Sequence, residues 1–218
     1  MRALAALAVV VVAGCGSGSG ERRDGPLEVL ERLREGGYVV FLRHAATDHS
    51  QRDRLGVPPT DCGGQRNLTD AGREQARELG RAWRALAIPV GDVLSSGYCR
   101  TRETAELAFG RATIVPALTG IPTEQVGTYA GRVRALRRLL GTRPDAGENV
   151  VVVGHIANLE AATEVELEEG DAAVFEPLGE RRFRLVARVP ASTWPQLIGR
   201  VDSTAARASR SNGFARYG

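Results

Sequence analysis

The sequence contains few of the residues that mark several common protein classes. It has three cysteines, no lysine and only 5% aromatic residues among its 218 residues. Neither a zinc-finger spacing nor a basic stripe interleaved with aromatic side chains is present, so the composition does not indicate nucleic-acid binding. The positive charge comes from arginine, which in the predicted helices mostly alternates with glutamate, as on a solvated surface. With 43% hydrophobic residues, the chain has room for one sizeable α/β domain, or at most two small ones.

The N-terminal apolar run is too short to span a bilayer unaided. Residues 3–13 are apolar, follow a single arginine and precede small residues around Cys15, which is typical of a secretory signal. The four residues 12–15 resemble the lipobox of bacterial lipoproteins, in which the cysteine is lipidated and becomes the mature N-terminus. An ordinary cleaved signal or a plain membrane anchor is the alternative, but the flexible linker at residues 16–20 favours the lipoprotein, because a lipidated cysteine needs a tether.

We therefore expect residues 1–20 to be a lipoprotein signal and linker. The mature protein would then be held by lipid on the membrane of a bacterial cell envelope, on the extracytoplasmic side. If Cys15 carries lipid, Cys62 and Cys99 remain as a pair in an oxidising compartment, and we predict that they form a disulfide. Closing a loop of about 38 residues would stabilise the fold by roughly 3 to 4 kcal/mol, less any strain. Two free thiols are the alternative.

Strands and helices are predicted to alternate along residues 21–202. This order favours one α/β domain with a mostly parallel, doubly wound sheet and helices on both faces. Two further strands, at 172–178 and 181–189, are expected to pair at the sheet edge. Residues 203–218 are rich in Ser, Ala, Arg and Gly, so we expect a disordered tail, with a surface helix as the competing interpretation. The other predicted strands are 38–42, 92–96, 112–115 and 149–153, and the predicted helices are 27–34, one opening at Thr69, 99–109 and 126–140.

Three of the predicted strands lead into cationic residues at their carboxyl ends. The first delivers Arg43 and His44, the second leads to Arg100, and the fourth delivers His155. Because the carboxyl ends of parallel strands share one edge of a sheet, these four residues could converge on one crevice. Arginine matches phosphate oxygens bidentately, and clustered positive charge stabilises a transferring phosphoryl group.

Four motifs in this order resemble the histidine phosphatase superfamily, also called phosphoglycerate mutase-like. They are "LRH" with Thr47 three residues on, "RNLTDAGREQA", "LSSGYCRTRETAE" and "VVVVGH". The resemblance runs from about residue 38 to 176 and implies a phosphoglycerate mutase-like fold. A full phosphoglycerate mutase is longer, so the chain is more similar to the short phosphatase branch.

The resemblance also implies a mechanism and a set of residues. His44 would attack phosphorus and form a phosphohistidine that water later cleaves. Arg43, Arg100 and His155 would surround the phosphoryl oxygens, and Arg66 matches a further phosphate-facing position. No metal or cofactor is implied, because these side chains supply the positive charge. The substrate would be a small phosphomonoester or a phosphorylated envelope component, and protein partners cannot be named from the sequence.

The leaving-group proton donor is open. Glu124 lies where many members of the superfamily place an acidic residue, and Asp48 is a rival. The chain also departs from the family pattern by carrying Ala45 and Ile156 where glycine is usual. Alanine is a mild change, whereas isoleucine adds bulk beside the expected phosphate pocket and bears on substrate range.

Each of these candidate site residues also has an interpretation without a catalytic role. The histidines could be structural, the arginines could form surface salt bridges, and His49 with His44 and Asp48 invites a metal site, although it lacks a recognised ligand spacing. Tyr98 is expected to shape the loop before Arg100. A phosphomutase is the enzymatic alternative, and a phosphate-binding envelope lipoprotein with little turnover is the alternative from another class.

Overall fold

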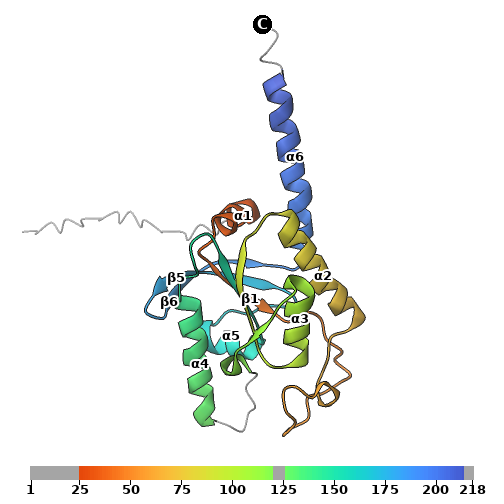
Figure 1. The fold of residues 1–218 in the computed structure, drawn as a ribbon, viewed down its shortest axis with the longest axis vertical. Coiled ribbons are helices and arrows are strands. Elements are labelled where there is room, and N and C mark those ends of the chain that lie inside the picture. Colours follow the sequence, from red (N-terminus) through yellow and green to blue (C-terminus); the bar gives the residue numbers. More distant parts are fainter. Residues whose placement is uncertain (1–24, 120–125, 214–218) are drawn as a thin grey trace, which may run out of the picture.

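The computed structural model describes residues 25–119 and 126–213. The helices and strands alternate for most of this length (Figure 1). The strands are β1 (Val39–Arg43), β2 (Val90–Ser95), β3 (Thr113–Ile114), β4 (Asn149–Gly154), β5 (Ala172–Gly179) and β6 (Arg182–Val189). The helices are α1 (Pro26–Glu35), α2 (Asp70–Ala85), α3 (Cys99–Phe109), α4 (Val126–Gly141), α5 (Ile156–Thr163) and α6 (Thr193–Gly213).

One sheet of six strands runs in the order β3-β2-β4-β1-β5-β6. The pairs β2–β3, β2–β4 and β1–β4 are parallel, whereas β5 is antiparallel to both β1 and β6. The predicted mostly parallel sheet with a hairpin at one edge is confirmed. In register, Arg43 is opposite Gly154 and Ser95 is opposite Val153, so β1, β2 and β4 end at the same level of the sheet.

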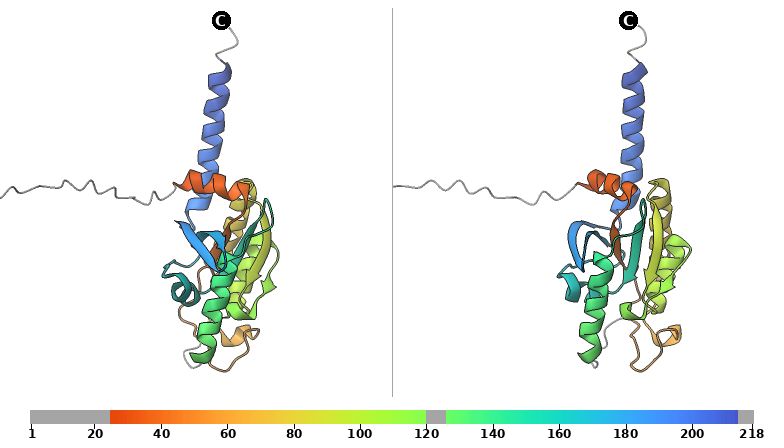
Figure 2. Two further views of the ribbon diagram at one scale, coloured as in Figure 1. Left: turned by 90° about the vertical axis from the view of Figure 1, so that its left-hand side faces the viewer. Right: turned by 60° about the vertical axis from the view of Figure 1, so that its left-hand side comes forward.

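Helices cover both faces of the sheet, as expected for this fold (Figures 1 and 2). Alternate residues of β1 point to opposite faces, because side chains in a strand alternate. Val40 and Leu42 belong to a core shared with α1, α2, α3 and the start of α6, and Val39 and Phe41 belong to a second core shared with α4 and α5. The sheet is therefore buried on both faces, and it supports the edge at which β1, β2 and β4 end.

The C-terminal helix departs from the sequence-based expectation. We expected disorder over 203–218, but α6 continues to Gly213, so the helical alternative is correct for residues 203–213. Trp194 and Leu197 bury its first turns in the core, and Ala and Arg, which are frequent beyond them, favour propagation of a helix already begun. The later turns project away from the sheet (Figure 2).

The described residues carry no sign of a membrane span. Within 25–119 and 126–213, no helix combines the length and the hydrophobicity that crossing a bilayer requires. The predicted lipoprotein signal at residues 1–20, with Cys15, lies outside the described residues.

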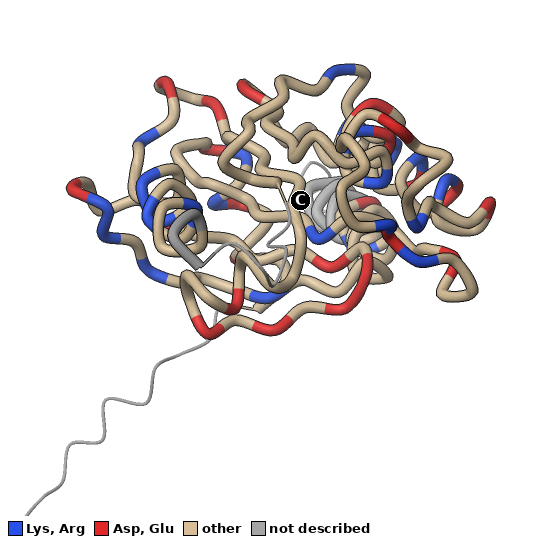
Figure 3. The backbone as a smooth tube through the Cα atoms, turned by 90° about the horizontal axis from the view of Figure 1, so that it is seen from below, with Lys and Arg blue, Asp and Glu red and all other residues tan. Residues whose placement is uncertain are grey.

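Figure 3 shows basic and acidic positions interspersed along the chain.

Candidate active site

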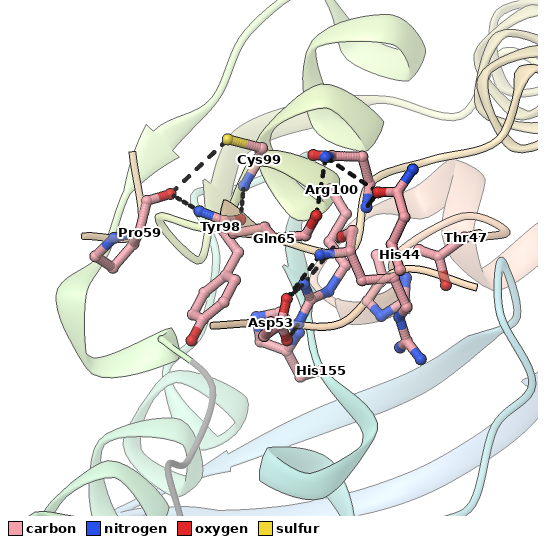
Figure 4. A network of polar contacts seen from close by, with 12 residues as sticks. His44, Thr47, Asp53, Pro59, Gln65, Tyr98, Cys99, Arg100 and His155 are labelled. Atoms are coloured by element: carbon pink, nitrogen blue, oxygen red, sulfur yellow. Dashed lines mark hydrogen bonds and ion pairs between the residues drawn. The ribbon is translucent and has the colours of Figure 1, made fainter. Parts of the chain in front are cut away.

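The carboxyl edge of the sheet brings together the residues that the sequence singled out. His44 follows β1 directly, and His155 follows β4 and is the N-cap residue of α5. The centres of the two imidazole rings lie 5.6 Å apart. Arg100 lies in the first turn of α3, close to both rings (Figure 4). Residues more than one hundred positions apart in the chain thus share one site.

His44 is fixed in one tautomer. Its Nδ1 lies 2.9 Å from the carbonyl oxygen of Ala45, and because a carbonyl only accepts, Nδ1 carries the proton and Nε2 keeps its lone pair. The backbone is held as well: the His44 N–H donates to Gly154, and its carbonyl accepts from Gly170 at 3.0 Å. Burial above all, with Arg100 and Arg43 nearby, lowers the pKa of His44 to about 4. At neutral pH it is a neutral imidazole suited to nucleophilic attack.

His155 is neutral for a similar reason. Burial lowers its pKa well below the ordinary value, and the positive charge of Arg100 acts in the same direction. Its Nε2 lies 2.9 Å from the hydroxyl oxygen of Ser96, which follows β2. The ring of Tyr98 meets the ring of His155 edge-on at 5.1 Å, so Tyr98 lines the site, as expected of the loop before Arg100.

Arg100 is a buried cation whose terminal nitrogens are already bound. Its Nη1 and Nη2 donate to the two carboxylate oxygens of Asp53 at 2.9 and 3.0 Å, and Nη1 also donates to the carbonyl of Arg66 at 3.2 Å. The guanidinium group lies over the face of the Tyr98 ring, 4.6 Å from its centre.

Arg43 and Arg66 approach a second carboxylate, that of Glu169. The Nη2 atoms of both arginines lie 3.7 Å from its Oε1. Arg43 also donates through Nη1 to the carbonyl of Leu167 at 2.6 Å, and Nη1 of Arg66 lies 3.2 Å from Nδ1 of His49. Glu169 itself is fixed by Thr47, whose hydroxyl and N–H groups donate to it at 2.7 and 2.9 Å.

All three arginines keep a buried donor without a partner. Among the described residues, six buried side-chain polar atoms have no hydrogen-bond partner, and three of them are the Nε atoms of Arg43, Arg66 and Arg100. Buried donors are nearly always satisfied, because an unpaired one costs about 1 to 3 kcal/mol. Three such donors around two neutral imidazoles make a site for a multiply charged oxyanion.

Asp53 and Glu169 were missed in the sequence analysis. The length and polarity of the loop from residue 45 to 67 did point to function, and Asp53 lies in that loop, but nothing in either residue's neighbourhood predicts its arginine partners. Burial opposes ionisation of both, yet hydrogen bonds from Arg100 and the Arg66 N–H lower the pKa of Asp53, and those from Thr47 lower the pKa of Glu169. Both are carboxylates at neutral pH.

The structure does not favour Asp48 as a proton donor. Its carboxylate accepts hydrogen bonds from Ser50 and Gln51 within its own loop, and these lower its pKa, so it is ionised. Glu124, the other candidate, lies outside the described residues. Within the part of the chain that the structure describes, no group of three or more His, Cys, Asp and Glu residues could hold a metal ion.

The two departures from the family pattern have different surroundings. Ala45 is buried behind the site, and its N–H donates to the hydroxyl of Thr104 at 3.1 Å. Ile156 is partly buried and packs against the core between the sheet and α4 and α5. A hydrophobic contact of this kind explains a branched side chain at the start of α5.

The predicted disulfide between Cys62 and Cys99 is confirmed, with Cα atoms 5.6 Å apart. It joins the loop that carries Asp53 and Arg66 to the residue just before Arg100. Gln65 adds a second link, because its Oε1 accepts from the N–H of Cys99 at 3.0 Å (Figure 4). The covalent bond therefore holds two parts of the anion site in register.

Comparison with known proteins agrees with this geometry. The family model of the histidine phosphatase superfamily (branch 1) matches residues 39–119, the segment that holds Arg43, His44, Arg66 and Arg100. Over this segment, which is less than half of the chain, the sequence is similar to this superfamily. The match supports a histidine-type phosphatase, and His155 extends the site beyond the matched segment. No curated protein matches the chain by sequence.

A solved phosphatase structure is similar to this chain in fold. Phosphoserine phosphatase from Entamoeba histolytica, in complex with 3-phosphoglyceric acid, aligns with a TM-score of 0.53 and 13% identity, over 72% of this chain and 98% of that one. The protein histidine phosphatase SixA, complexed with tungstate, aligns with a TM-score of 0.48 and 18% identity, over 71% of this chain and 97% of that one. The phosphoglycerate mutase-like α/β fold that the sequence predicted is confirmed.

Loss of the disulfide should weaken both the fold and the site of this protein. We expect Cys62→Ser with Cys99→Ser to lower the free energy of unfolding by about 3 kcal/mol, because the unfolded chain loses a cross-link. Substrate affinity should fall as well, since the loop with Asp53 and Arg66 is released. Denaturant unfolding and KM measure the two effects. Peptide mass analysis showing both cysteines alkylated in unreduced, denatured protein would contradict the pairing.

Acid should destabilise the folded protein through the buried histidines. In the unfolded chain His44 titrates near 6.5, whereas in the folded protein it does so at about 4. Between these values the unfolded state alone binds the proton, so stability falls as the pH drops, by roughly 3 kcal/mol for His44. His155 acts in the same direction. Urea unfolding at pH 7 and pH 4.5 should show a smaller decrease for His44→Ala than for the wild type; equal decreases would refute the buried, neutral His44.

Proposed function

We propose that this histidine phosphatase hydrolyses a small phosphomonoester through a phosphohistidine on His44. The observation that carries the proposal is that three buried, unpartnered arginine Nε–H groups share a site with a neutral imidazole whose Nε2 is free. A phosphoryl group has the charge and the oxygen atoms to satisfy these donors. The family match supports the same chemistry.

The first chemical step is an in-line displacement at phosphorus. Nε2 of His44 forms the N–P bond with its lone pair while the bond to the leaving oxygen breaks, and the leaving group departs with that electron pair. Arg43, Arg66 and Arg100 offset the charge on the equatorial oxygens, and His155 contributes a hydrogen bond. In the second step water attacks phosphorus and the N–P bond breaks, its electron pair returning to Nε2, so that inorganic phosphate is released and neutral His44 is regenerated.

Protonation of the leaving group distinguishes good substrates from poor ones. Asp48 is ionised and bound within its loop, which leaves Glu124 as the donor that the resemblance implies. General acid help is typically worth about 10² to 10⁴-fold. Esters whose leaving groups are already acidic, such as aryl phosphates, need that help least and are the first substrates to test.

We further propose that the protein works outside the cytoplasm, anchored by lipid on Cys15. The lipobox-like residues 12–15 and the flexible linker support the anchor. The Cys62–Cys99 disulfide supports the compartment, because disulfides persist in oxidising environments and are rare in the cytosol. The natural substrate would then be a phosphorylated small molecule or envelope component.

Turnover of an aryl phosphate tests the chemistry. We expect the purified protein to hydrolyse it with and without a chelator, and His44→Ala to reduce kcat by at least about 10³-fold, because the nucleophile is lost. Glu168→Gln, an exposed residue on the loop before β5, is the control that should retain full activity. Preserved turnover in a folded His44→Ala protein would refute the nucleophile assignment, and binding of orthovanadate without turnover in the wild type would favour the phosphate-binding lipoprotein.

Membrane association tests the lipid anchor. The wild-type protein expressed in a bacterium should sediment with membranes and carry lipid on its mature N-terminal peptide, whereas Cys15→Ala should appear in the soluble fraction. A variant that remains as tightly associated with membranes as the wild type would count against lipidation at this residue.

A further inference from the structure

We propose that Asp53 and Glu169 are positioning residues. They hold the terminal nitrogens of the three site arginines and so orient the three Nε–H groups toward the phosphoryl oxygens. This inference rests on the proposed function and concerns how the same site is built. Neither carboxylate was singled out from the sequence. Asp53 is drawn beside Arg100 in Figure 4.

The geometry of a guanidinium group explains how one arginine can bind a carboxylate and a phosphoryl group at the same time. It offers two bidentate edges, one formed by Nη1 and Nη2 and the other by Nε and Nη2. Asp53 occupies the first edge of Arg100, with bonds of 2.9 and 3.0 Å to Nη1 and Nη2. The Nε atom is buried and has no partner among the described residues. The edge left for an oxyanion is therefore the one that contains Nε.

Glu169 lies beside the other two arginines and approaches them as an ion pair rather than through hydrogen bonds. Its Oε1 lies 3.7 Å from the Nη2 atoms of both Arg43 and Arg66, while the Nε atoms of both are buried without a partner. The carbonyl of Leu167 binds Nη1 of Arg43 from the same loop. One carboxylate thus offsets the repulsion between two cations and leaves their Nε groups without a hydrogen bond.

Both carboxylates are themselves held by the backbone of the site. Asp53 Oδ1 accepts from the N–H of Arg66 at 2.9 Å, in addition to the bond from Arg100. Glu169 accepts two hydrogen bonds from Thr47, and the next residue, Gly170, donates to the carbonyl of His44. Hydrogen bonds therefore connect Glu169 and Gly170 to the segment that carries the nucleophile, and they connect Asp53 to the loop that the disulfide holds.

The opposite interpretation is that the carboxylates are resident competitors that phosphate must displace. Displacing Asp53 would break three hydrogen bonds at once, those from the two Nη atoms of Arg100 and from the Arg66 N–H. A phosphoryl group bound at the Nε edge would leave these three bonds intact. The two interpretations predict opposite changes in anion affinity when the carboxylate is removed. Positioning predicts weaker binding, whereas competition predicts tighter binding, because a competitor is lost.

The experiment measures orthovanadate affinity by calorimetry, and KM and kcat for an aryl phosphate, in the full-length protein. We expect Asp53→Asn to weaken orthovanadate binding and raise KM about tenfold, the effect of losing one charge-assisted hydrogen bond. Glu169→Gln should change both quantities in the same direction, because it removes the ion pairs with Arg43 and Arg66. The value of kcat should change less, since the nucleophile is untouched. Matched controls remove the same charge nearby: Asp61→Asn, which keeps an oxygen acceptor for the N–H of Gly63, and Glu168→Gln beside Glu169. Melting temperatures verify that all variants are folded.

A double-mutant cycle separates positioning from a general effect on the fold. If Asp53 acts through Arg100, Asp53→Asn should weaken orthovanadate binding no further in an Arg100→Ala background, while its effect should add to that of Glu169→Gln. Unchanged or tighter binding in Asp53→Asn and Glu169→Gln, or full additivity with Arg100→Ala, would overturn the proposal.

The same measurements distinguish failure of this inference from failure of the proposed function. A wild-type protein that binds orthovanadate and hydrolyses no ester would overturn the phosphatase, while the affinities of the variants would still decide the role of the carboxylates. A folded wild-type protein that does not bind orthovanadate would overturn both.

Discussion

Three guanidinium groups crowd around two imidazoles at the carboxyl edge of one sheet, and their mutual repulsion has to be balanced before any substrate arrives. Asp53 and Glu169 provide that balance, and burial keeps His44 and His155 neutral beside the arginines. The resting site therefore keeps a net positive charge and a free imidazole lone pair together. Other features of the fold, including the level at which three strands end and the disulfide, serve to keep these groups in place.

Much of this arrangement could be predicted because its signals are local. The strand ends carry Arg43, His44 and His155 directly, and the register of β1 with β4 brings them to one level. The helix predicted to open at Thr69 does so, with the Thr69 hydroxyl accepting from the N–H of Gly72. Periodicity and caps are properties of a few consecutive residues, so they are visible without the fold.

The parts that could not be predicted depend on residues far apart in the chain. Arg100 and Asp53 are separated by 47 positions, and Thr47 and Glu169 by 122. No spacing rule joins such pairs, and each carboxylate sits among other charged residues in the sequence. The helix α5 after His155 and the extension of α6 were likewise missed or misjudged, because the packing of Leu159 and Trp194 on the sheet decides them rather than composition.

The disulfide is an intermediate case, predicted from cysteine number and compartment, yet its structural role appeared only in the fold. It fastens the loop with Asp53 and Arg66 next to Arg100, so one bond serves both stability and the geometry of the anion site. Such a link persists in an oxidising compartment, which is where we propose that the protein works.

The central claim is that His44 is the nucleophile and that Arg43, Arg66 and Arg100 bind the phosphoryl group. Trapping the intermediate tests it most directly. Rapid quench of the wild-type protein during turnover of an aryl phosphate, followed by peptide mass analysis under alkaline conditions, should show one acid-labile phosphoryl group on the peptide that contains His44. A burst of released phenol with the phosphoryl group on another residue, or with none on the protein, would contradict the account.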